Sequence, residues 1–215
     1  MNFAELLSKG GPVVYLLLCA SILALAIVFL KLFQFRKLNW AHYKKVSSLV
    51  KNINSQAIED SLSQLEGLPS PLARVVEAAL IGASKENLNE DQLKAEITRV
   101  GSIELRSLDS FLRTLGAIAH LAPLLGLLGT VLGMIKAFRE LEGTEVAVNP
   151  ALLAGGIWEA LVTTALGLIV AIPTLAFYYY FEGKIDDTKA SMKDVSTRFL
   201  LRFKNKAENS ETRDA

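Results

Sequence analysis

The sequence predicts an all-α integral membrane protein with three transmembrane helices, the second and third of which extend into a cytoplasmic helical stalk. Three long apolar blocks stand apart in a chain of 215 residues that is 51% hydrophobic, and this content exceeds that of an ordinary soluble domain. Between the blocks, apolar residues recur at helical spacing, without strand-like alternation of useful length. The formal net charge of +1 indicates no global field that would attract nucleic acid or acidic substrates.

The first transmembrane helix is predicted over residues 12–33, after an N-terminal segment, residues 1–11, that we place outside the cytoplasm. Its apolar run is close to the roughly 20 residues that span a hydrocarbon core of about 30 Å. Pro12 suits the first helical turn, where its missing amide costs no hydrogen bond. Glu5 and Lys9 stand where a cleaved signal would carry a basic cluster, so we expect a retained anchor.

Positive charge follows this first helix and predicts its orientation. No acidic residue occurs from the end of the helix to Glu59, whereas the basic residues from the last helical turn onward include Lys31, Arg36, Lys37, Lys44 and Lys45. Because an excess of lysine and arginine keeps a flank on the cytoplasmic side, we expect the N-terminus on the opposite side.

A cytoplasmic helical domain is predicted over residues 34–112, with two or three helices separated by breaks at 67–71 and 87–89. Asn89 and Gln92 have the spacing of a capping box that opens the last of these helices. One apolar stripe consists of Leu72, Val75, Val76, Ala79 and Leu80, and a second of Leu93, Ile97, Val100, Leu108, Phe111 and Leu115, with Glu104 as a polar interruption. Such helical spacing predicts buried helix faces.

The second transmembrane helix is predicted over residues 113–138, as a continuation of the cytoplasmic helix before it. No stop signal separates the two, so we expect one long uninterrupted rod. A short periplasmic loop, residues 139–150, carries three glutamates against one arginine. Its lack of excess positive charge fits the outer side of the membrane.

The third transmembrane helix is predicted over residues 151–181. A helix of this length reaches about 45 Å, which is more than the hydrocarbon core requires, so it should project from one face. A cytoplasmic C-terminal helix follows over residues 182–204, and its stripe consists of Ile185, Met192, Val195, Phe199 and Phe203. The remaining residues, 205–215, are polar and predicted to be disordered.

Nothing in the sequence favours an enzyme. A phosphate-binding glycine loop, a nucleophile elbow and metal-ligand spacing are all missing from the chain. Cys19 is the single cysteine, and we interpret the two histidines, His42 and His120, as interfacial polar residues. We therefore predict no catalytic residue, no metal, no cofactor and no nucleic-acid partner.

The third apolar run contains polar residues that need an explanation: Glu159, Thr163 and Thr164. Placing a charge near a bilayer centre costs at least about 2.5 to 3.5 kcal/mol, so such residues usually face protein or water and often serve transport. The pattern favours a polar cavity or an ion path, and the alternative is a glutamate at the outer interface that pairs with a lysine or arginine. Around an ideal helix, Glu159 lies about 40° from Thr163 and about 140° from Thr164, which does not choose between the threonines.

Small residues punctuate the second apolar run. Gly129 and Gly133 have small-xxx-small spacing, and Gly126 precedes them, so this face should allow close helix packing. Thr130 stands among these glycines, and its hydroxyl is a candidate to meet those of the third run.

Two segments carry a resemblance to a known family: APLLGLLGTVLGMIKAF at residues 122–138 and IWEALVTTALGLIVAIP at residues 157–173. They resemble the ExbB, TolQ and MotA family of proton-driven motor subunits. The chain lacks the fourth span and the larger cytoplasmic insertion of MotA-like proteins, so it is similar to the ExbB and TolQ branch. The opening GGPVVYLLLCASILALAIVF, residues 10–29, looks more like ExbB-type proteins.

The resemblance implies a homopentamer in the bacterial inner membrane, with a periplasmic N-terminus and a cytoplasmic C-terminus. It implies two copies of a single-span partner like ExbD or TolR, whose membrane aspartate carries protons, together with a TonB-like protein and membrane lipids. Thr130 and Thr164 match the family's pore-lining threonines and Glu159 its pore-lining glutamate, whereas relatives also place a small residue at the position of Thr163. Hydroxyl rings can serve either H⁺ or Na⁺.

The function that follows from the resemblance is a proton-channel subunit that drives a TonB-type protein for outer-membrane uptake. One alternative is a TolQ-like subunit that maintains envelope integrity. An alternative of another class is a passive oligomeric scaffold, in which the glycines only pack helices and Glu159 is structural. A channel that conducts without a partner is disfavoured, because a pore lined mainly by leucine, alanine and glycine offers little water binding.

Overall fold

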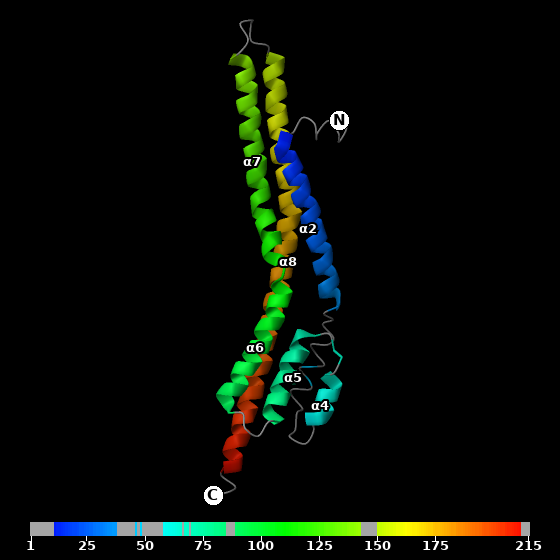
Figure 1. The fold of residues 1–215 in the computed structure, drawn as a ribbon, viewed down its shortest axis with the longest axis vertical. Coiled ribbons are helices and arrows are strands. Elements are labelled where there is room, and N and C mark those ends of the chain that lie inside the picture. Colours follow the sequence, from blue (N-terminus) through cyan, green and yellow to red (C-terminus); the bar gives the residue numbers. More distant parts are fainter. Residues whose placement is uncertain are drawn as a thin grey trace. The chain divides into compact units, whose positions relative to one another are not determined.

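The computed structural model describes residues 11–37, 46, 48, 58–65, 67–68, 70–84, 89–142 and 150–211. All the elements in these ranges are α-helices (Figure 1), which confirms the predicted fold class. They are α2 (Gly11–Lys37), α4 (Ile58–Leu65), α5 (Pro71–Ser84), α6 (Glu90–Asp109), α7 (Leu112–Glu142) and α8 (Pro150–Glu211). The predicted N-terminal segment, residues 1–11, lies outside the described residues except for Gly11.

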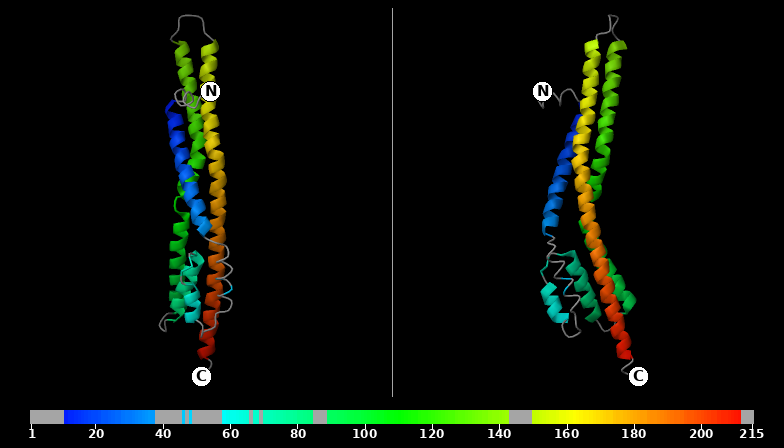
Figure 2. Two further views of the ribbon diagram at one scale, coloured as in Figure 1. Left: turned by 90° about the vertical axis from the view of Figure 1, so that its right-hand side faces the viewer. Right: turned by 180° about the vertical axis from the view of Figure 1, so that it is seen from behind.

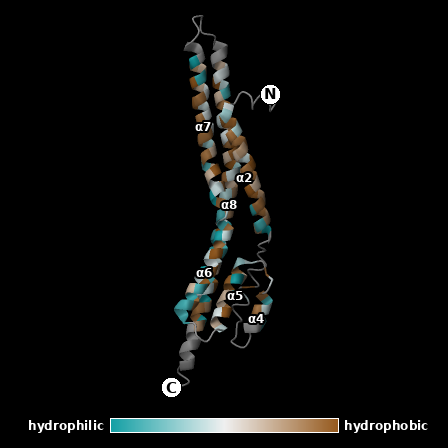
Figure 3. Cartoon of the chain, viewed as in Figure 1, coloured by the Kyte–Doolittle hydropathy of each residue, from teal (hydrophilic) through white to brown (hydrophobic). Residues whose placement is uncertain are grey.

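Three stretches are long and apolar enough to cross a membrane: Gly11–Arg36, Glu90–Arg139, which contains the junction of α6 and α7, and Ala154–Phe203. Figure 3 shows hydrophobic residues along α2, along α7 and along the first part of α8. These are the three runs that the sequence predicts as transmembrane helices.

The chain divides into two compact units, residues 1–31 with 111–181 and residues 32–110 with 182–215. In the first unit, α7 and the beginning of α8 run side by side in both views of Figure 2. A small buried cluster joins three helices of this unit, and its members are Val13 and Leu17 of α2, Ala122 of α7 and Ala171 of α8.

The second unit has an ordinary hydrophobic core, in which the predicted apolar stripes meet. Its buried members are Val46, Leu65, Leu72, Ala73, Val75, Val76, Ala79, Leu80, Leu93, Ile97, Met192, Val195 and Phe199. Apart from Val46, they come from α4, α5, α6 and the C-terminal part of α8, and Val100 and Phe203 pack against them. Glu104 is the polar residue in its stripe. Its charge is not left without a partner, because its carboxylate accepts a hydrogen bond of 2.8 Å from Arg74.

The helix boundaries in this unit follow the local signals. Between α4 and α5, Gly67 has φ of 78°, a left-handed conformation that glycine adopts without strain. The Asn89 side chain accepts from the Gln92 amide at 2.8 Å, and the Asn89 amide donates to the Gln92 side chain at 3.2 Å. The predicted capping box is therefore present at the start of α6.

The predicted uninterrupted rod through residues 90–138 is wrong, because α6 ends at Asp109 and α7 begins at Leu112. The Ser110 hydroxyl donates to the Ser107 carbonyl at 2.8 Å, and the Ser110 backbone has a non-helical ψ of 136°. Phe111 has φ of 62°, which disfavours a right-handed helix at that residue. Phe111 is also exposed rather than part of a buried stripe.

Three of the helices continue past the C-terminal ends that the sequence predicts for them. α2 runs to Lys37, past the expected end at residue 33, and α7 runs to Glu142, into the segment expected to be a loop. α8 runs to Glu211, so helix also covers part of the segment expected to be disordered, residues 205–215. Residues 143–149 and 212–215 lie outside the described residues. Pro123 and Pro173 lie inside α7 and α8 without ending either helix.

Shortening Leu80 should destabilise the second unit. Leu80 is 0% exposed, and Leu→Ala at such a site typically costs about 2 to 5 kcal/mol through lost burial and a cavity. We expect Leu80→Ala to lower the midpoint of thermal unfolding, followed by circular dichroism of the purified protein in detergent. Ile81→Ala is the matched control, because its neighbouring side chain is 41% exposed. Equal midpoints for the two variants would contradict this description of the core.

Candidate functional site

The backbones of α7 and α8 approach closely along a seam of small residues. A Cβ atom added to Gly129 would lie 2.5 Å from Thr163 Oγ1, and one added to Gly167 would lie 2.6 Å from the Ala122 carbonyl oxygen. At Gly126 it would lie 3.0 Å from both the Thr163 carbonyl oxygen and the Thr164 Cα. Glycine is therefore required at the centre of this seam.

The seam continues from this centre toward the end of α7 and the beginning of α8. Toward the α7 C-terminus, a Cβ on Gly133 would lie 3.1 Å from Ala160 Cβ. Further along, one on Gly156 would lie 2.5 Å from Ala137 Cβ. Small residues let two helix backbones come together, and van der Waals packing then holds them in a membrane.

A single carbonyl oxygen, that of Gly126, bonds to both candidate threonines of α8. Thr163 Oγ1 donates to the Ala160 carbonyl at 2.6 Å and reaches the Gly126 carbonyl at 3.2 Å. Thr164 Oγ1 donates to the Gly126 carbonyl at 3.1 Å. Thr163 is only 2% exposed, whereas Thr164 is half-buried. The two adjacent hydroxyls therefore share an acceptor but differ in access.

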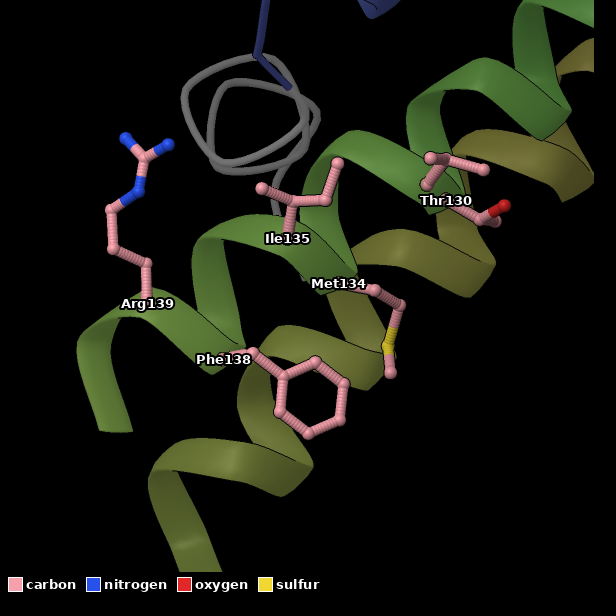
Figure 4. A pocket seen from close by; sticks show the side chains of 6 residues that line it. Thr130, Met134, Ile135, Phe138 and Arg139 are labelled. Carbon is pink, nitrogen blue, oxygen red and sulfur yellow. The ribbon is translucent and has the colours of Figure 1, made fainter. Parts of the chain in front are cut away.

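Thr130 lies one turn beyond Gly126 on α7, about 40° around the helix, and it is half-buried. Its hydroxyl donates to the Leu127 carbonyl at 2.6 Å, within its own helix, so the Thr130 hydroxyl does not bond to that of Thr164. Thr130 lines an open groove of about 590 Å³. The other lining residues are Val131, Met134, Ile135, Phe138 and Arg139, and Figure 4 shows Thr130, Met134 and Phe138 on successive turns of α7.

Glu159 is half-buried on α8 and lies one turn before Thr163. Among the described residues it takes part in no ion pair, unlike Glu104, which pairs with Arg74, and Glu96, which pairs with Arg99. The alternative interpretation, a glutamate paired with a lysine or arginine of its own chain, gains no support from this part of the structure.

The sequence reasoning missed the α8 half of the seam. Small residues recur on α8 every three or four positions, and they are Gly156, Ala160, Thr163, Gly167, Ala171 and Thr174. This spacing matches one helix face and was available as a signal. The shared Gly126 carbonyl could not have been found in this way, because a backbone acceptor carries no residue-specific signal.

The described residues contain no group of three or more histidine, cysteine, aspartate or glutamate side chains that could hold a metal ion. The polar groups of the site are instead hydroxyls, one carboxylate and backbone carbonyls. Such groups can carry protons or bind cations in a membrane.

The three long apolar helices and the polar residues inside them define a multi-pass membrane protein with a candidate ion pathway. Residues 67–194 match the MotA/TolQ/ExbB proton channel family. The chain belongs to this family, whose members are channel components and not enzymes.

Several relatives carry ExbB names. The chain is 32% identical over 185 residues to an ExbB homolog of Methanothermobacter thermautotrophicus, which covers 85% of this chain and 64% of that protein. It is 31% identical over 175 residues to an ExbB-like protein of Synechocystis, covering 81% of this chain and 82% of the relative. It is 29% identical over 222 residues to the biopolymer transport protein ExbB of Neisseria meningitidis, covering 93% and 98%.

The chain spans only part of some relatives. The match covers 64% of the Methanothermobacter protein and 43% of the biopolymer transport protein ExbB of Salmonella typhimurium, to which the chain is 38% identical over 110 residues.

A methyl group at Gly129 should force the α7–α8 seam apart. Because its Cβ would lie 2.5 Å from Thr163 Oγ1 and 2.7 Å from Thr163 Cβ, the helices must shift, at a cost of about 1 to 3 kcal/mol. We expect Gly129→Ala to lower the thermal unfolding midpoint of the purified protein in detergent. Gly155→Ala is the control, because nothing lies within 4 Å of its added Cβ. An unchanged midpoint for Gly129→Ala would refute the described seam.

Proposed function

We propose that this chain is the channel subunit of an ExbB-type motor in the bacterial inner membrane. With a partner protein, it converts proton motive force into work on a TonB-type protein for uptake across the outer membrane. The observation that carries this proposal is the pairing of the Thr163 and Thr164 hydroxyls with the Gly126 carbonyl between two apolar helices. Family membership supports proton conduction, and the ExbB names of the relatives favour this branch over a TolQ-like envelope-integrity subunit.

The assembly that we propose is a homopentamer around two copies of a single-span partner like ExbD or TolR. Large apolar side chains of α7 and α8 are exposed in the single chain, among them Leu124, Ile135, Trp158, Ile169 and Ile172. Lipid or further helices must cover them. The apolar segments of α2, α7 and α8 contain no aspartate, so a partner that supplies a membrane aspartate would complete the pathway.

Within this assembly we assign different roles to the polar residues. Thr130 and Thr164, which are half-buried, would line the pathway, and Glu159 would tune entry from the outer side. Thr163 is buried in the seam, so we assign it to helix packing and to the Gly126 carbonyl rather than to the pathway. Gly126, Gly129 and Gly133 would keep the two pathway helices at a fixed separation.

The orientation that we propose places the N-terminus in the periplasm and the C-terminus in the cytoplasm. The basic residues that follow the first span support it, because such residues are retained in the cytoplasm. A growth experiment distinguishes the clients. Deleting the gene should prevent growth on iron chelates if the chain serves uptake, whereas detergent sensitivity would favour the TolQ-like function.

Removing the Thr164 hydroxyl should abolish energised uptake while the complex still assembles. Thr164→Val keeps the shape of the side chain but removes a group that we place on the pathway, so we expect uptake to fall about tenfold or more. The measurement is uptake in cells that depend on this system, with assembly checked by co-purification of the partner.

Thr174→Val is the matched control for Thr164→Val. Thr174 lies on the same helix and donates to the Val170 carbonyl at 2.6 Å, and it is buried. Thr164→Ser should retain uptake. Full uptake by Thr164→Val would remove Thr164 from the pathway and would favour the passive scaffold.

Neutralising Glu159 should slow proton entry without abolishing it. A charge at the mouth of a narrow path raises the local cation concentration, and its loss typically lowers entry rates by about tenfold. We expect Glu159→Gln to reduce proton flux into vesicles that contain the assembled complex, and Glu159→Asp to restore most of it. If Glu159→Gln conducts as well as the unmodified complex, Glu159 has no role in entry.

A further inference from the structure

His120 is an ionisable side chain inside the second apolar run, and the proposed function assigns it no role. At 1.5 Å per residue it lies about 10 Å along α7 from Arg113 and about 24 Å from Lys136. These two charges are about as far apart as the two faces of a hydrocarbon core, and the run between them contains no ionisable side chain other than His120. An ionisable residue at such a depth is rare and usually marks an ion pathway.

Tyr178 of α8 lies against His120, because Gly116, one turn earlier on α7, leaves room for its ring. A Cβ added to Gly116 would lie 2.8 Å from Tyr178 Cε2, so a larger residue there would displace the ring. The rings of His120 and Tyr178 meet edge to face, with centroids 6.5 Å apart and planes inclined by 67°. Tyr178 is half-buried, whereas His120 is exposed in the single chain. The contact therefore positions the imidazole while part of its surface stays open.

The opposite directions of α7 and α8 bring the two rings together. Gly129 faces Thr163. Gly133, further along α7, faces Ala160, which comes earlier in α8. Because Cα–Cβ bonds tilt toward the N-terminus of their own helix, the His120 side chain leans toward the beginning of α7, and its tyrosine partner leans toward it. In the proposed orientation, the imidazole therefore leans toward the cytoplasm.

Both rings continue the face of the helix pair that carries the accessible threonines. Tyr178 lies about 40° around α8 from Thr164 and about 21 Å further along that helix. His120 lies about 80° around α7 from Thr130 and about 15 Å before it. Since the helices are antiparallel, both displacements run toward the same end of the pair. An ionisable group therefore stands on the side of these threonines, between them and the proposed cytoplasmic end.

The surroundings of His120 allow it to release a proton as well as to take one up. Its contact is with Tyr178, which Tyr179 touches in turn with ring centroids 5.3 Å apart. No carboxylate pairs with His120 in the described part of the chain, so no ion pair would hold an imidazolium there. The other charged or titratable groups described in the first unit are Tyr15, Cys19 and Lys31 of α2, Arg113, Lys136 and Arg139 of α7, and Glu159 and Tyr180 of α8.

We propose that His120, positioned by Tyr178, carries protons between the threonine site and the cytoplasmic end of α7. This inference rests on the proposed function and names a residue for proton exit. Imidazole gains and loses a proton near neutral pH, which a threonine hydroxyl does not.

The transfer uses both nitrogens of the ring. A neutral imidazole has one acceptor nitrogen and one N–H donor. The acceptor nitrogen takes a proton from protonated water on the threonine side, and the other nitrogen gives its proton to water on the cytoplasmic side. One proton enters and one leaves, and rotation of the ring restores the first tautomer.

The experiment measures proton flux through the whole complex, purified with its partner and placed in lipid vesicles that contain a pH-sensitive dye. We expect His120→Ala to lower the flux about tenfold or more, because a positioned proton carrier typically contributes at least that factor. Millimolar imidazole should then restore flux, since it fits the space that the missing side chain leaves. Pyrazole has the same size but is not basic at neutral pH, so it should restore none.

Two variants serve as controls. Leu121→Ala removes the neighbouring side chain, which is 54% exposed and carries no proton, and it should conduct as well as the unmodified complex. Thr164→Val interrupts the pathway at a different point, so imidazole should not restore its flux. Vesicles with Thr164→Val also measure the protons that imidazole itself carries across the lipid. Co-purification of the partner checks that each variant assembles.

Unchanged flux in His120→Ala would overturn the relay and leave His120 an interfacial polar residue. A loss of flux that imidazole does not restore above the Thr164→Val background, or that pyrazole restores equally, would overturn it too and assign His120 to helix packing. If Thr164→Val loses its flux while His120→Ala keeps it, this inference alone fails. If Thr164→Val conducts fully, or if no partner co-purifies, the proposed function itself fails.

Discussion

The carbonyl oxygen of Gly126 reaches two hydroxyls on the neighbouring helix because no Cβ atom stands between the backbones at that level. Gly126 and Gly167 face each other there, and a Cβ on Gly167 would lie 3.1 Å from Gly126 Cα and 2.6 Å from the Ala122 carbonyl oxygen. The placement of Thr163 and Thr164 depends on this close approach. A wider separation would leave Thr164 without its interhelical acceptor and would free its proton.

The two units of the chain are stabilised by different physical effects. In the second unit, apolar stripes of α4, α5, α6 and the C-terminal part of α8 bury leucine, valine and phenylalanine against one another, which is the usual hydrophobic effect. In the first unit, lipid is as apolar as the side chains, so the hydrophobic effect does not drive one helix onto another. Close van der Waals contact between small residues, supported by hydroxyl–carbonyl bonds, takes its place.

The same hydroxyls illustrate why buried polar groups in membranes are informative. Thr130, Thr163 and Thr164 each donate their hydroxyl proton to a backbone carbonyl, so none of the three carries an unpaired donor in apolar surroundings. Glu159 differs, because it is half-buried without an ion pair in the described residues. The hydroxyls are therefore compatible with a packed helix pair alone, whereas the carboxylate calls for water or another chain.

The apolar runs and the amphipathic stripes were sufficient to predict the three long helices, the core of the second unit and the Asn89 capping box, because these depend on local composition and period. The break at Ser110 and Phe111 was not predictable in this way, since neither residue is a strong helix breaker. For the site, the sequence determined that Glu159, Thr163 and Thr164 share one apolar helix. Only the tertiary structure decided that Thr163 is buried and Thr164 accessible. A helix that is apolar on every side has no hydrophobic face that would define its rotation about its own axis. The packing of small residues between α7 and α8 defines the rotation of α8 instead.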